Sequence, residues 1–471
     1  MLSFCIKDVV CATGGELLCG DPQTVVTDVV TDSRLAGEGA LFVPLIGERV
    51  DAHRFIPEVL RAGAATLTSK REAAVGVEDL PGGVVVWVED TLAAFQKLAS
   101  WYRQQFDIPV IGITGSVGKT TTKEMVSAVL ATKFNLLKTI GNLNSQIGVA
   151  QMMFHIEKDT EIAVFEMGMS MPGEMARLVE IARPQTAVVT NIGVSHIGNL
   201  GSREAIAFEK GHIVKYVGSS QDGMCYICGN GDLPALTKDN IPYELCVGNC
   251  ETIFYGTASG CQIQATDIQV TETGQSFQYH GREDCTVELS VMGGHNVNNA
   301  VVALALGEQF GVELDQALEA LRQYRPFSMR GERRDCHGYH LIDDTYNASP
   351  DSINSNIDAL FDYGTEGRKI VVLGDVLELG EQNESLHRGI GDYIIQEAEK
   401  GKKLSYVITV GEGAAFICRQ VEKGSDIPTR ICSSNEEAAE FVRQLAQPGD
   451  WVLVKGSRGM HMDEVVKKVV M

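Results

Sequence analysis

The sequence lacks any apolar run long enough to enter a membrane. No part of its 471 residues approaches the roughly 20 uninterrupted apolar residues that a membrane-spanning helix needs. The N-terminal segment reaches Asp8 before an apolar signal-peptide core can form. There is also no repeat, low-complexity tract or block of like charges. We therefore expect a folded cytoplasmic protein without membrane insertion.

Positive charge is scarce. The chain has 40 Lys and Arg against 62 Asp and Glu, a formal net charge of −22. This balance argues against non-specific binding to nucleic acid or to an anionic membrane surface. An anionic substrate would have to be held by backbone amides, a few well-placed cations and bound metal ions, because the overall field repels it.

A disulfide framework is also missing, although the chain contains 12 cysteines. They are scattered along a chain with no secretion signal, so reduced thiols are expected. Cys225 and Cys228, followed by Cys246 and Cys250, approximate the spacing of a zinc ribbon. The first pair lies in an apolar β-like run, where the two side chains point to opposite faces. We favour buried, inert cysteines over a metal site.

The length and the hydrophobic pattern predict three α/β domains, at residues 1–104, 105–325 and 326–471. From residue 108 onward, buried β-runs alternate with helical segments, as in a doubly wound, mainly parallel sheet. The stretch 250–289 alternates polar and apolar residues and predicts inserted antiparallel strands. A third region with four β-runs separated by helices follows residue 326.

The strongest motif is VIGITGSVGKTTTKEM, in which a buried strand, a glycine turn and a helix follow one another. Backbone N–H groups of such a turn surround a polyphosphate at the positive end of the helix. Lys119 would reach the β- and γ-phosphates of ATP, and the Thr120 hydroxyl would bind Mg²⁺. The spacing departs from the strict G-x-x-x-x-G-K form, because Ile113 occupies the expected glycine position. The loop predicts nucleotide binding but does not define the reaction.

Polar residues follow several other predicted strands. Glu166 comes directly after an apolar run, where a carboxylate can hold Mg²⁺. His196 follows another strand, and Lys210 is placed near the start of the next helix; taken alone, these would be a loop histidine and a surface lysine. The turns IDDTYNASPDS, GDVLELG and KGSRG predict a cleft that faces another domain.

Together these segments resemble the Mur ligase family. The segments TGSVGKTTTK, GNLNSQIGVA, EMGMS, NIGVSHIGNLGS, AFEKGHI, GGHNVNNAVVALALG, IDDTYNASPDS, VLGDVLELGEQNESLH and VLVKGSRGMHMDEVV occur in the family's order. An N-terminal element, DSR…GALFVPLIGERVDAHRFI, extends the resemblance over essentially the whole chain. It implies an N-terminal UDP-sugar-binding domain, a central P-loop ATPase domain and a Rossmann-like C-terminal domain.

The resemblance also implies roles for individual residues. The expected ATP-binding residues are Gly115, Ser116, Val117, Gly118, Lys119, Thr120, Thr121, Asn296, Asn299, Arg330, Asp344, Tyr346 and Asn347. The expected metal ligands are Thr120, Glu166, His196 and Lys210, the lysine as a carbamate. The expected catalytic residues are Lys119, Lys210, Arg330 and His196, and Ser33 and Arg34 match the element that meets the uridine diphosphate. Met329 replaces the family's usual glycine beside Arg330.

The implied activity is ATP-dependent amide-bond formation with Mg²⁺. Within the family, the resemblance favours members that join D-alanyl-D-alanine to UDP-N-acetylmuramoyl-tripeptide, the last cytoplasmic step of peptidoglycan precursor synthesis. We expect a monomer acting on small-molecule substrates. The alternatives are a folylpolyglutamate synthase, the Mur ligase that adds the third peptide residue, a P-loop ATPase or switch, and an inactive homologue.

Overall fold

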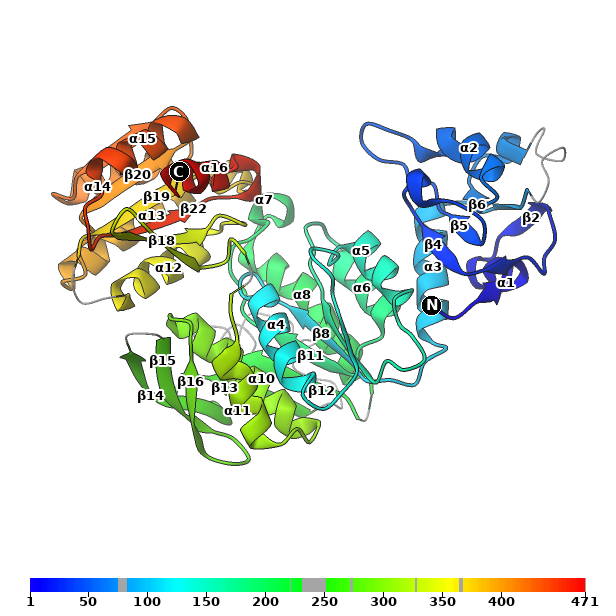
Figure 1. The fold of residues 1–471 in the computed structure, drawn as a ribbon, viewed down its shortest axis with the longest axis horizontal. Coiled ribbons are helices and arrows are strands. Elements are labelled where there is room, and N and C mark those ends of the chain that lie inside the picture. Colours follow the sequence, from blue (N-terminus) through cyan, green and yellow to red (C-terminus); the bar gives the residue numbers. More distant parts are fainter. Residues whose placement is uncertain are drawn as a thin grey trace.

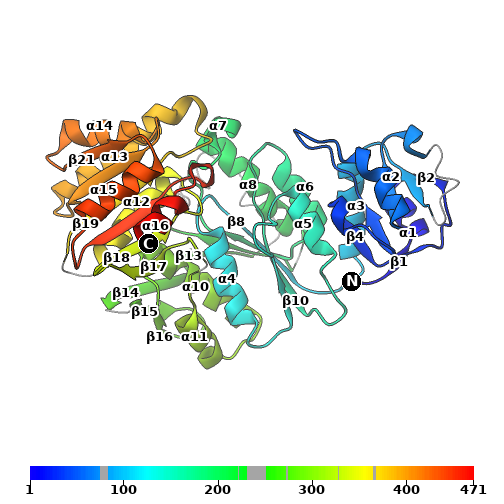
Figure 2. The same cartoon turned by 45° about the horizontal axis from the view of Figure 1, so that its top comes forward.

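The computed structural model describes residues 1–74, 83–220, 222–230, 251–271, 274–326, 328–363 and 367–470. The described chain forms three sheet-containing regions in a row, with the N-terminal region at one end and the C-terminal region at the other (Figures 1 and 2). The predicted α/β class is confirmed, since helices and strands alternate in all three. The domain boundaries at 104/105 and 325/326 fall between the three sheets and stay predictions.

The N-terminal region is built on a five-stranded sheet in the order β2-β7-β6-β5-β4, in which only β2 is antiparallel to its neighbour. A small antiparallel pair, β1 and β3, lies beside it. The strands are β1 (Phe4–Cys5), β2 (Glu16–Cys19), β3 (Val25–Val26), β4 (Asp28–Val30), β5 (Ala40–Phe42), β6 (Ala65–Thr68) and β7 (Val85–Trp87). The helices are α1 (Ile6–Thr13), η1 (Ser33–Leu35), η2 (Ala52–Phe55), α2 (Ile56–Arg61), η3 (Arg71–Ala74) and α3 (Thr91–Arg103).

Helix α3 joins this region to the central one. The Tyr102 hydroxyl donates to the Ile156 carbonyl (2.9 Å), and the Arg103 guanidinium donates to the Ala182 carbonyl (3.1 Å). Both side chains are buried, so α3 shares a core with the central helices.

The central region carries a nine-stranded sheet in the order β16-β15-β14-β13-β12-β11-β8-β10-β9. Its strands are β8 (Val110–Thr114), β9 (Leu136–Lys138), β10 (Ile162–Glu166), β11 (Thr186–Val189), β12 (Met224–Cys228), β13 (Glu251–Gly256), β14 (Ile263–Thr271), β15 (Gly274–His280) and β16 (Cys285–Leu289). The helices are α4 (Lys119–Leu130), α5 (Gln146–Met153), α6 (Glu174–Ala182), α7 (Ile197–Leu200), α8 (Arg203–Gly218), α10 (Gly294–Gln309) and α11 (Leu314–Gln323).

Both faces of this sheet are covered. Along β8, Val110 packs in the core with α5, α6 and α8, whereas Ile111 and Ile113 pack in the core with α4, α10 and α11. Cys225 and Cys228 are buried in these two opposite cores, as the β-pattern predicts. Cys246 and Cys250, the second pair of the zinc-ribbon alternative, lie outside the described residues.

The prediction of an antiparallel insert was partly wrong. Strand β13 is parallel to both β12 and β14, and only β14, β15 and β16 pair antiparallel. Alternation of polar and apolar residues reports a half-exposed strand, but it carries no information on strand direction.

The C-terminal region has a six-stranded sheet in the order β17-β18-β22-β19-β20-β21, parallel except for β17. Its strands are β17 (Glu332–Cys336), β18 (Tyr339–Asp344), β19 (Lys369–Gly374), β20 (Tyr406–Val410), β21 (Thr429–Cys432) and β22 (Trp451–Lys455). The helices are α12 (Pro350–Asp362), η5 (Gly380–Gln382), α13 (Asn383–Glu399), α14 (Ala415–Gly424), α15 (Asn435–Leu445), η6 (Arg458–Met460) and α16 (Asp463–Val470). No helix among the described residues is long and apolar enough to cross a membrane.

Candidate active site

The phosphate loop connects the end of β8 to the start of α4. Gly115 has φ 149°, and a Cβ there would lie 1.9 Å from the Thr190 hydroxyl oxygen. Gly118 has φ 86° and caps the N-terminus of α4. Both positions favour glycine because their backbone angles are rare for other residues, and at Gly115 a side chain would also collide with Thr190. The loop therefore has the tight turn that the sequence predicts.

Residues that follow β11 form hydrogen bonds with this loop. The Asn191 side-chain oxygen accepts hydrogen bonds from the backbone N–H groups of Ser116 (3.0 Å) and Val117 (2.7 Å). The Ser116 hydroxyl in turn accepts from the Gly193 N–H (2.9 Å). The next N–H groups belong to the first turn of α4, where no intrahelical acceptor exists and the helix dipole favours an anion. Sequence analysis missed Asn191, because nothing local links it to a loop 75 residues earlier.

Two lysines, the half-buried Lys119 and the buried Lys210, converge on one carbonyl of the loop. The Gly115 carbonyl accepts from Lys119 Nζ (2.7 Å) and from Lys210 Nζ (3.0 Å). Burial lowers the pKa of Lys119, with the positive charge of Arg330 adding to this and Glu166 opposing it. Burial and the neighbouring Lys119 charge place the pKa of Lys210 well below its usual value.

The surface interpretation of Lys210 was wrong. This residue lies in the middle of α8, and only 1% of its surface is exposed. A lysine is buried at such cost only where the surroundings require it, which makes Lys210 a candidate for chemistry.

Glu166 lies buried at the end of β10, facing the first turn of α4. One carboxylate oxygen accepts from the Thr120 hydroxyl (2.8 Å), and the other accepts from the Asn144 amide (2.7 Å). Asn144 was not singled out from the sequence, although it belongs to the GNLNSQIG segment. A buried carboxylate beside a hydroxyl and an amide offers the oxygen ligands that Mg²⁺ prefers.

Among the described residues, no group of three or more His, Cys, Asp or Glu side chains converges as a ready-made metal cage. Mg²⁺ commonly takes only one or two carboxylates from the protein and completes its shell with substrate phosphates and water. The arrangement of Thr120, Glu166 and Asn144 beside a phosphate loop fits that type of site.

His196 connects the central and C-terminal regions. It caps the N-terminus of α7 with φ 65°, and its Nδ1 is hydrogen-bonded to a carboxylate oxygen of Glu378. The same hydrogen bond lowers the pKa of Glu378, so this carboxylate stays ionised. Glu378 was not predicted, and it reaches His196 from the VLGDVLELG segment of the third region. The Asp375 carboxylate in that segment instead accepts from the Ala414 N–H (2.6 Å) within its own region.

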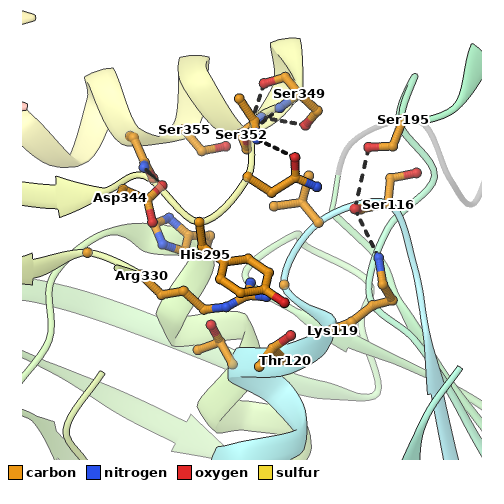
Figure 3. A pocket seen from close by; sticks show the side chains of 18 of the residues that line it. Ser116, Lys119, Thr120, Ser195, His295, Arg330, Asp344, Ser349, Ser352 and Ser355 are labelled. Atoms are coloured by element: carbon orange, nitrogen blue, oxygen red, sulfur yellow. Dashed lines mark hydrogen bonds between the residues drawn. The ribbon is translucent and has the colours of Figure 1, made fainter. Parts of the chain in front are cut away.

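Arg330 and Tyr346 form a stacked pair on the C-terminal side. The Arg330 guanidinium carbon lies 4.0 Å from the centre of the Tyr346 ring, and its buried Nε has no hydrogen-bond partner. Figure 3 shows Arg330 extending from the C-terminal side toward the phosphate-loop side that carries Lys119 and Thr120. Met329, at the position where the family has glycine, adopts a left-handed backbone with φ 61°. Glycine adopts this conformation at lower cost than methionine does.

The side of the cavity formed by the C-terminal region, here called the C-terminal wall, contains Arg330, Asp344, Tyr346, Asn347 and Lys455. Asp344 is paired with Lys455, whose Nζ also donates to the Asn347 carbonyl (3.0 Å). His295 lies between the two regions, and burial lowers its pKa. Neutral imidazole is therefore favoured at this position, which offers one donor and one acceptor to a ligand.

The two predicted site residues of the HNVNNA segment, Asn296 and Asn299, have different surroundings. Asn296 lines the cavity and donates to the Met292 carbonyl (2.7 Å). Asn299 is buried and accepts from the Thr122 hydroxyl (2.9 Å), which places it behind the phosphate loop. Asn299 therefore contacts α4 and is not among the residues that line the cavity.

These groups surround one cavity of about 470 Å³ between the central and C-terminal regions (Figure 3). Of the predicted site residues, those lining it are Ser116, Val117, Gly118, Lys119, Thr120, Thr121, Glu166, His196, Asn296, Arg330, Asp344, Tyr346 and Asn347. Gly115, Lys210 and Asn299 lie behind this lining, and Ser33 and Arg34 contribute nothing to it. The Arg34 guanidinium is 86% exposed and is paired with Asp32.

Comparison with known families identifies the chain. The Mur ligase middle domain matches residues 113–307, and the Mur ligase glutamate ligase domain matches residues 329–458. The UDP-N-acetylmuramoyl-tripeptide–D-alanyl-D-alanine ligase of Bacillus subtilis is 38% identical over 95% of this chain and 94% of its own length. The chain belongs to the Mur ligase family. The Escherichia coli ligase of the same name is 32% identical over 99% of this Mur ligase and 98% of its own length.

Solved structures agree with that assignment. This Mur ligase resembles MurF from Acinetobacter baumannii, with a TM-score of 0.88 and 28% identity over 100% of this chain and 99% of the other. MurF from Thermotoga maritima in complex with ADP gives 0.81 and 29%, over 94% and 96% of the two chains. A folylpolyglutamate synthase from Mycobacterium tuberculosis, at 17% identity and 0.62, shares the fold alone. The predicted Mur ligase architecture and the assignment as a ligase are confirmed.

Proposed function

We propose that this Mur ligase joins D-alanyl-D-alanine to UDP-N-acetylmuramoyl-tripeptide, with ATP as the energy source. The observation that carries the proposal is the 38% identity over 95% of the chain to a ligase of that name. The site supports it, because the phosphate loop and the C-terminal wall enclose one cavity rather than two separate surfaces.

ATP binds in this cavity with its phosphates on the loop and its nucleoside toward the C-terminal wall. The related Thermotoga MurF was solved with ADP. The first turn of α4 and Lys119 receive the phosphates, and the Arg330–Tyr346 pair and Asp344 line the far side. Asn296 and Asn347 supply hydrogen-bonding groups between these two parts.

Thr120 and Glu166 would hold Mg²⁺, and His196 lines the same cavity. When bound, it neutralises phosphate charge and withdraws electrons from the γ-phosphorus. Glu166 keeps its carboxylate oriented through Asn144, so the ligand geometry is set before substrate arrives.

The reaction needs no covalent enzyme intermediate. A carboxylate oxygen of the tripeptide attacks the γ-phosphorus of ATP, the bond to the β-phosphate oxygen breaks, and ADP leaves an acyl phosphate behind. The amine of D-alanyl-D-alanine then attacks the acyl carbon, releasing phosphate and one proton as the amide forms. Lys119 and Arg330 would stabilise the negative charge that spreads over the transferred phosphoryl group.

Lys210 is proposed to carry a carbamate. A carbamate forms when a neutral amine attacks CO₂ and loses a proton. Burial and the Lys119 charge lower the pKa of Lys210 and so favour the neutral amine. The product is an anion beside Lys119, which would provide the further metal ligand that the family resemblance implies.

The UDP end of the substrate is proposed to bind the N-terminal region at Ser33 and Arg34. These residues lie in η1, and no described residue before Ser116 lines the nucleotide cavity. The tripeptide carboxylate must nevertheless reach the γ-phosphate, so productive binding requires the regions to approach one another. We further infer a monomer working in the cytoplasm on small-molecule substrates.

The test is phosphate release measured with each substrate omitted in turn. A ligase releases phosphate only when ATP, UDP-N-acetylmuramoyl-tripeptide and D-alanyl-D-alanine are all present. Undiminished turnover without D-alanyl-D-alanine would instead identify an ATPase and contradict the proposal.

A further inference from the structure

The contact between the central and C-terminal regions at α7 carries an inference beyond the proposed function. Here η5 and the preceding turn of the C-terminal region pack against α7, which lies on the side of the central region next to the C-terminal region in both views (Figures 1 and 2). The Gly198 N–H donates to the Glu378 carbonyl (3.0 Å), and the Gln382 amide donates to the Gly201 carbonyl (3.1 Å). A Cβ at Gly198 would come within 2.7 Å of the Glu378 carbonyl oxygen. Two backbones thus meet at a position where a side chain would collide.

At this contact the side chains of His196 and Glu378 form a hydrogen bond. An ionised carboxylate only accepts hydrogen bonds, so His196 Nδ1 must be the donor to Glu378. With Nδ1 as the donor, a neutral imidazole keeps the Nε2 lone pair for a metal ion. Carboxylates commonly orient metal-binding histidines in this way.

Both members of the pair hold unusual backbone conformations. His196 has φ 65° and Glu378 has φ 63°, in the left-handed region that non-glycine residues rarely adopt. Such conformations persist where the surroundings impose them, and they concentrate at functional sites. The pair itself is partly solvent-exposed, since Glu378 keeps 52% of its side-chain surface, so it contributes little to stability. Two strained residues that add little stability indicate a role in positioning.

We propose that Glu378 is a positioning residue for His196 and that it couples docking of the C-terminal region to completion of the metal site. The carboxylate belongs to one region and the imidazole to the other, so the correct tautomer and ring orientation exist only when the two regions are in contact. Metal affinity and domain docking are therefore linked. This inference rests on the proposed function only in taking His196 as a metal ligand.

The test measures metal binding directly. Mn²⁺ is titrated into the full-length protein with ADP present, and free Mn²⁺ is followed by electron paramagnetic resonance. We expect Glu378→Ala to weaken Mn²⁺ binding about 10- to 100-fold, with Glu378→Gln intermediate because its amide oxygen still accepts from Nδ1. Glu381→Ala removes an exposed carboxylate three residues away and serves as the control, with unchanged affinity.

A double variant separates positioning from a general charge effect. If Glu378 acts through His196, Glu378→Ala causes no further loss of Mn²⁺ affinity in a His196→Ala background. Equal losses in both backgrounds, or wild-type affinity in Glu378→Ala, would overturn the inference. Ligation by the wild-type enzyme is assayed in parallel, so a failure of the proposed function is recognised separately from a failure of this coupling.

Discussion

The phosphate loop and the Ser33–Arg34 element were both expected to bind phosphate groups, but the structure gives them different surroundings. The loop is largely buried, and hydrogen bonds from its own Lys119 and with Asn191 and Lys210 hold it in place. Arg34 lies on an exposed 3₁₀ turn, and its guanidinium is paired, among the described residues, with its near neighbour Asp32 alone. The proposed nucleotide site is organised before ligand binds, whereas the proposed diphosphate site would have to reorganise its side chains.

This difference in burial suggests a division of roles between the phosphate-transfer step and the binding of the distant end of the substrate. Groups that stabilise a transition state must already point at the place where charge develops, so they are buried and fixed. Groups that hold a distant part of the substrate can remain on the surface and contribute affinity. The central loop should therefore control turnover, and the N-terminal element should control substrate binding.

The largest effect is expected at the centre of the loop. Lys119→Met keeps the side-chain length but removes the charge that is proposed to face the γ-phosphate, so kcat should fall by roughly 10³-fold. Steady-state ligation kinetics measure this. Lys158→Met, at an exposed lysine on the same region, should leave kcat unchanged. A loss confined to the KM for ATP would show that Lys119 only binds the nucleotide.

A smaller but still large effect is expected behind the loop. Lys210→Ala removes the proposed carbamate, and kcat should fall by roughly 10²-fold. Added formate or acetate should restore part of the activity, because a small carboxylate can occupy the vacated space.

The same anions added to Lys119→Met should restore nothing, which controls for non-specific activation. Full activity of Lys210→Ala without added anion would remove this residue from the site.

At the N-terminal element, only binding should change. Arg34→Ala deletes a guanidinium that is proposed to meet the diphosphate, and the KM for UDP-N-acetylmuramoyl-tripeptide should rise about tenfold. The kcat and the KM for ATP should stay close to wild type. Arg61→Ala, on an exposed face of α2 in the same region, is the matched control. A fall in kcat without a change in KM would contradict the division between capture and chemistry.

The smallest effect concerns the backbone beside Arg330. Met329→Gly should raise stability by about 1 kcal/mol, because glycine accepts the left-handed angle at lower cost. Thermal unfolding measures the shift. Ser328→Gly, next to it and without a positive φ, should lower stability slightly. A lower melting temperature for Met329→Gly would mean that the methionine side chain contributes more than the strain costs.

The features that sequence predicted best are those determined by neighbouring residues. The glycines of the phosphate loop, Lys119 and Thr120 follow from one strand-turn-helix pattern, and Glu166 follows from its place at a strand end. Local pattern did not predict Asn191, Asn144 and Glu378, because their hydrogen-bond partners lie 75, 22 and 182 residues away in the chain.

Burial was the other property that local pattern could not supply. Lys210 has the sequence surroundings of an ordinary helical lysine, and only the packing of α8 beneath the loop places it in the interior. The parallel direction of β13 was missed for the same reason, since pairing partners and not alternation decide it. Family resemblance supplied the roles of such residues, and those roles stay predictions until they are measured.

The central claim is that the cavity makes an amide bond to D-alanyl-D-alanine. Mass spectrometry of the reaction of UDP-N-acetylmuramoyl-tripeptide and ATP with D-alanyl-D-alanine, D-alanine or diaminopimelate in competition tests it most directly. We expect one new product, whose mass equals the UDP-tripeptide plus D-alanyl-D-alanine minus water, formed in a one-to-one ratio with ADP. ADP and phosphate without that product, or preferential addition of either single amino acid, would contradict it.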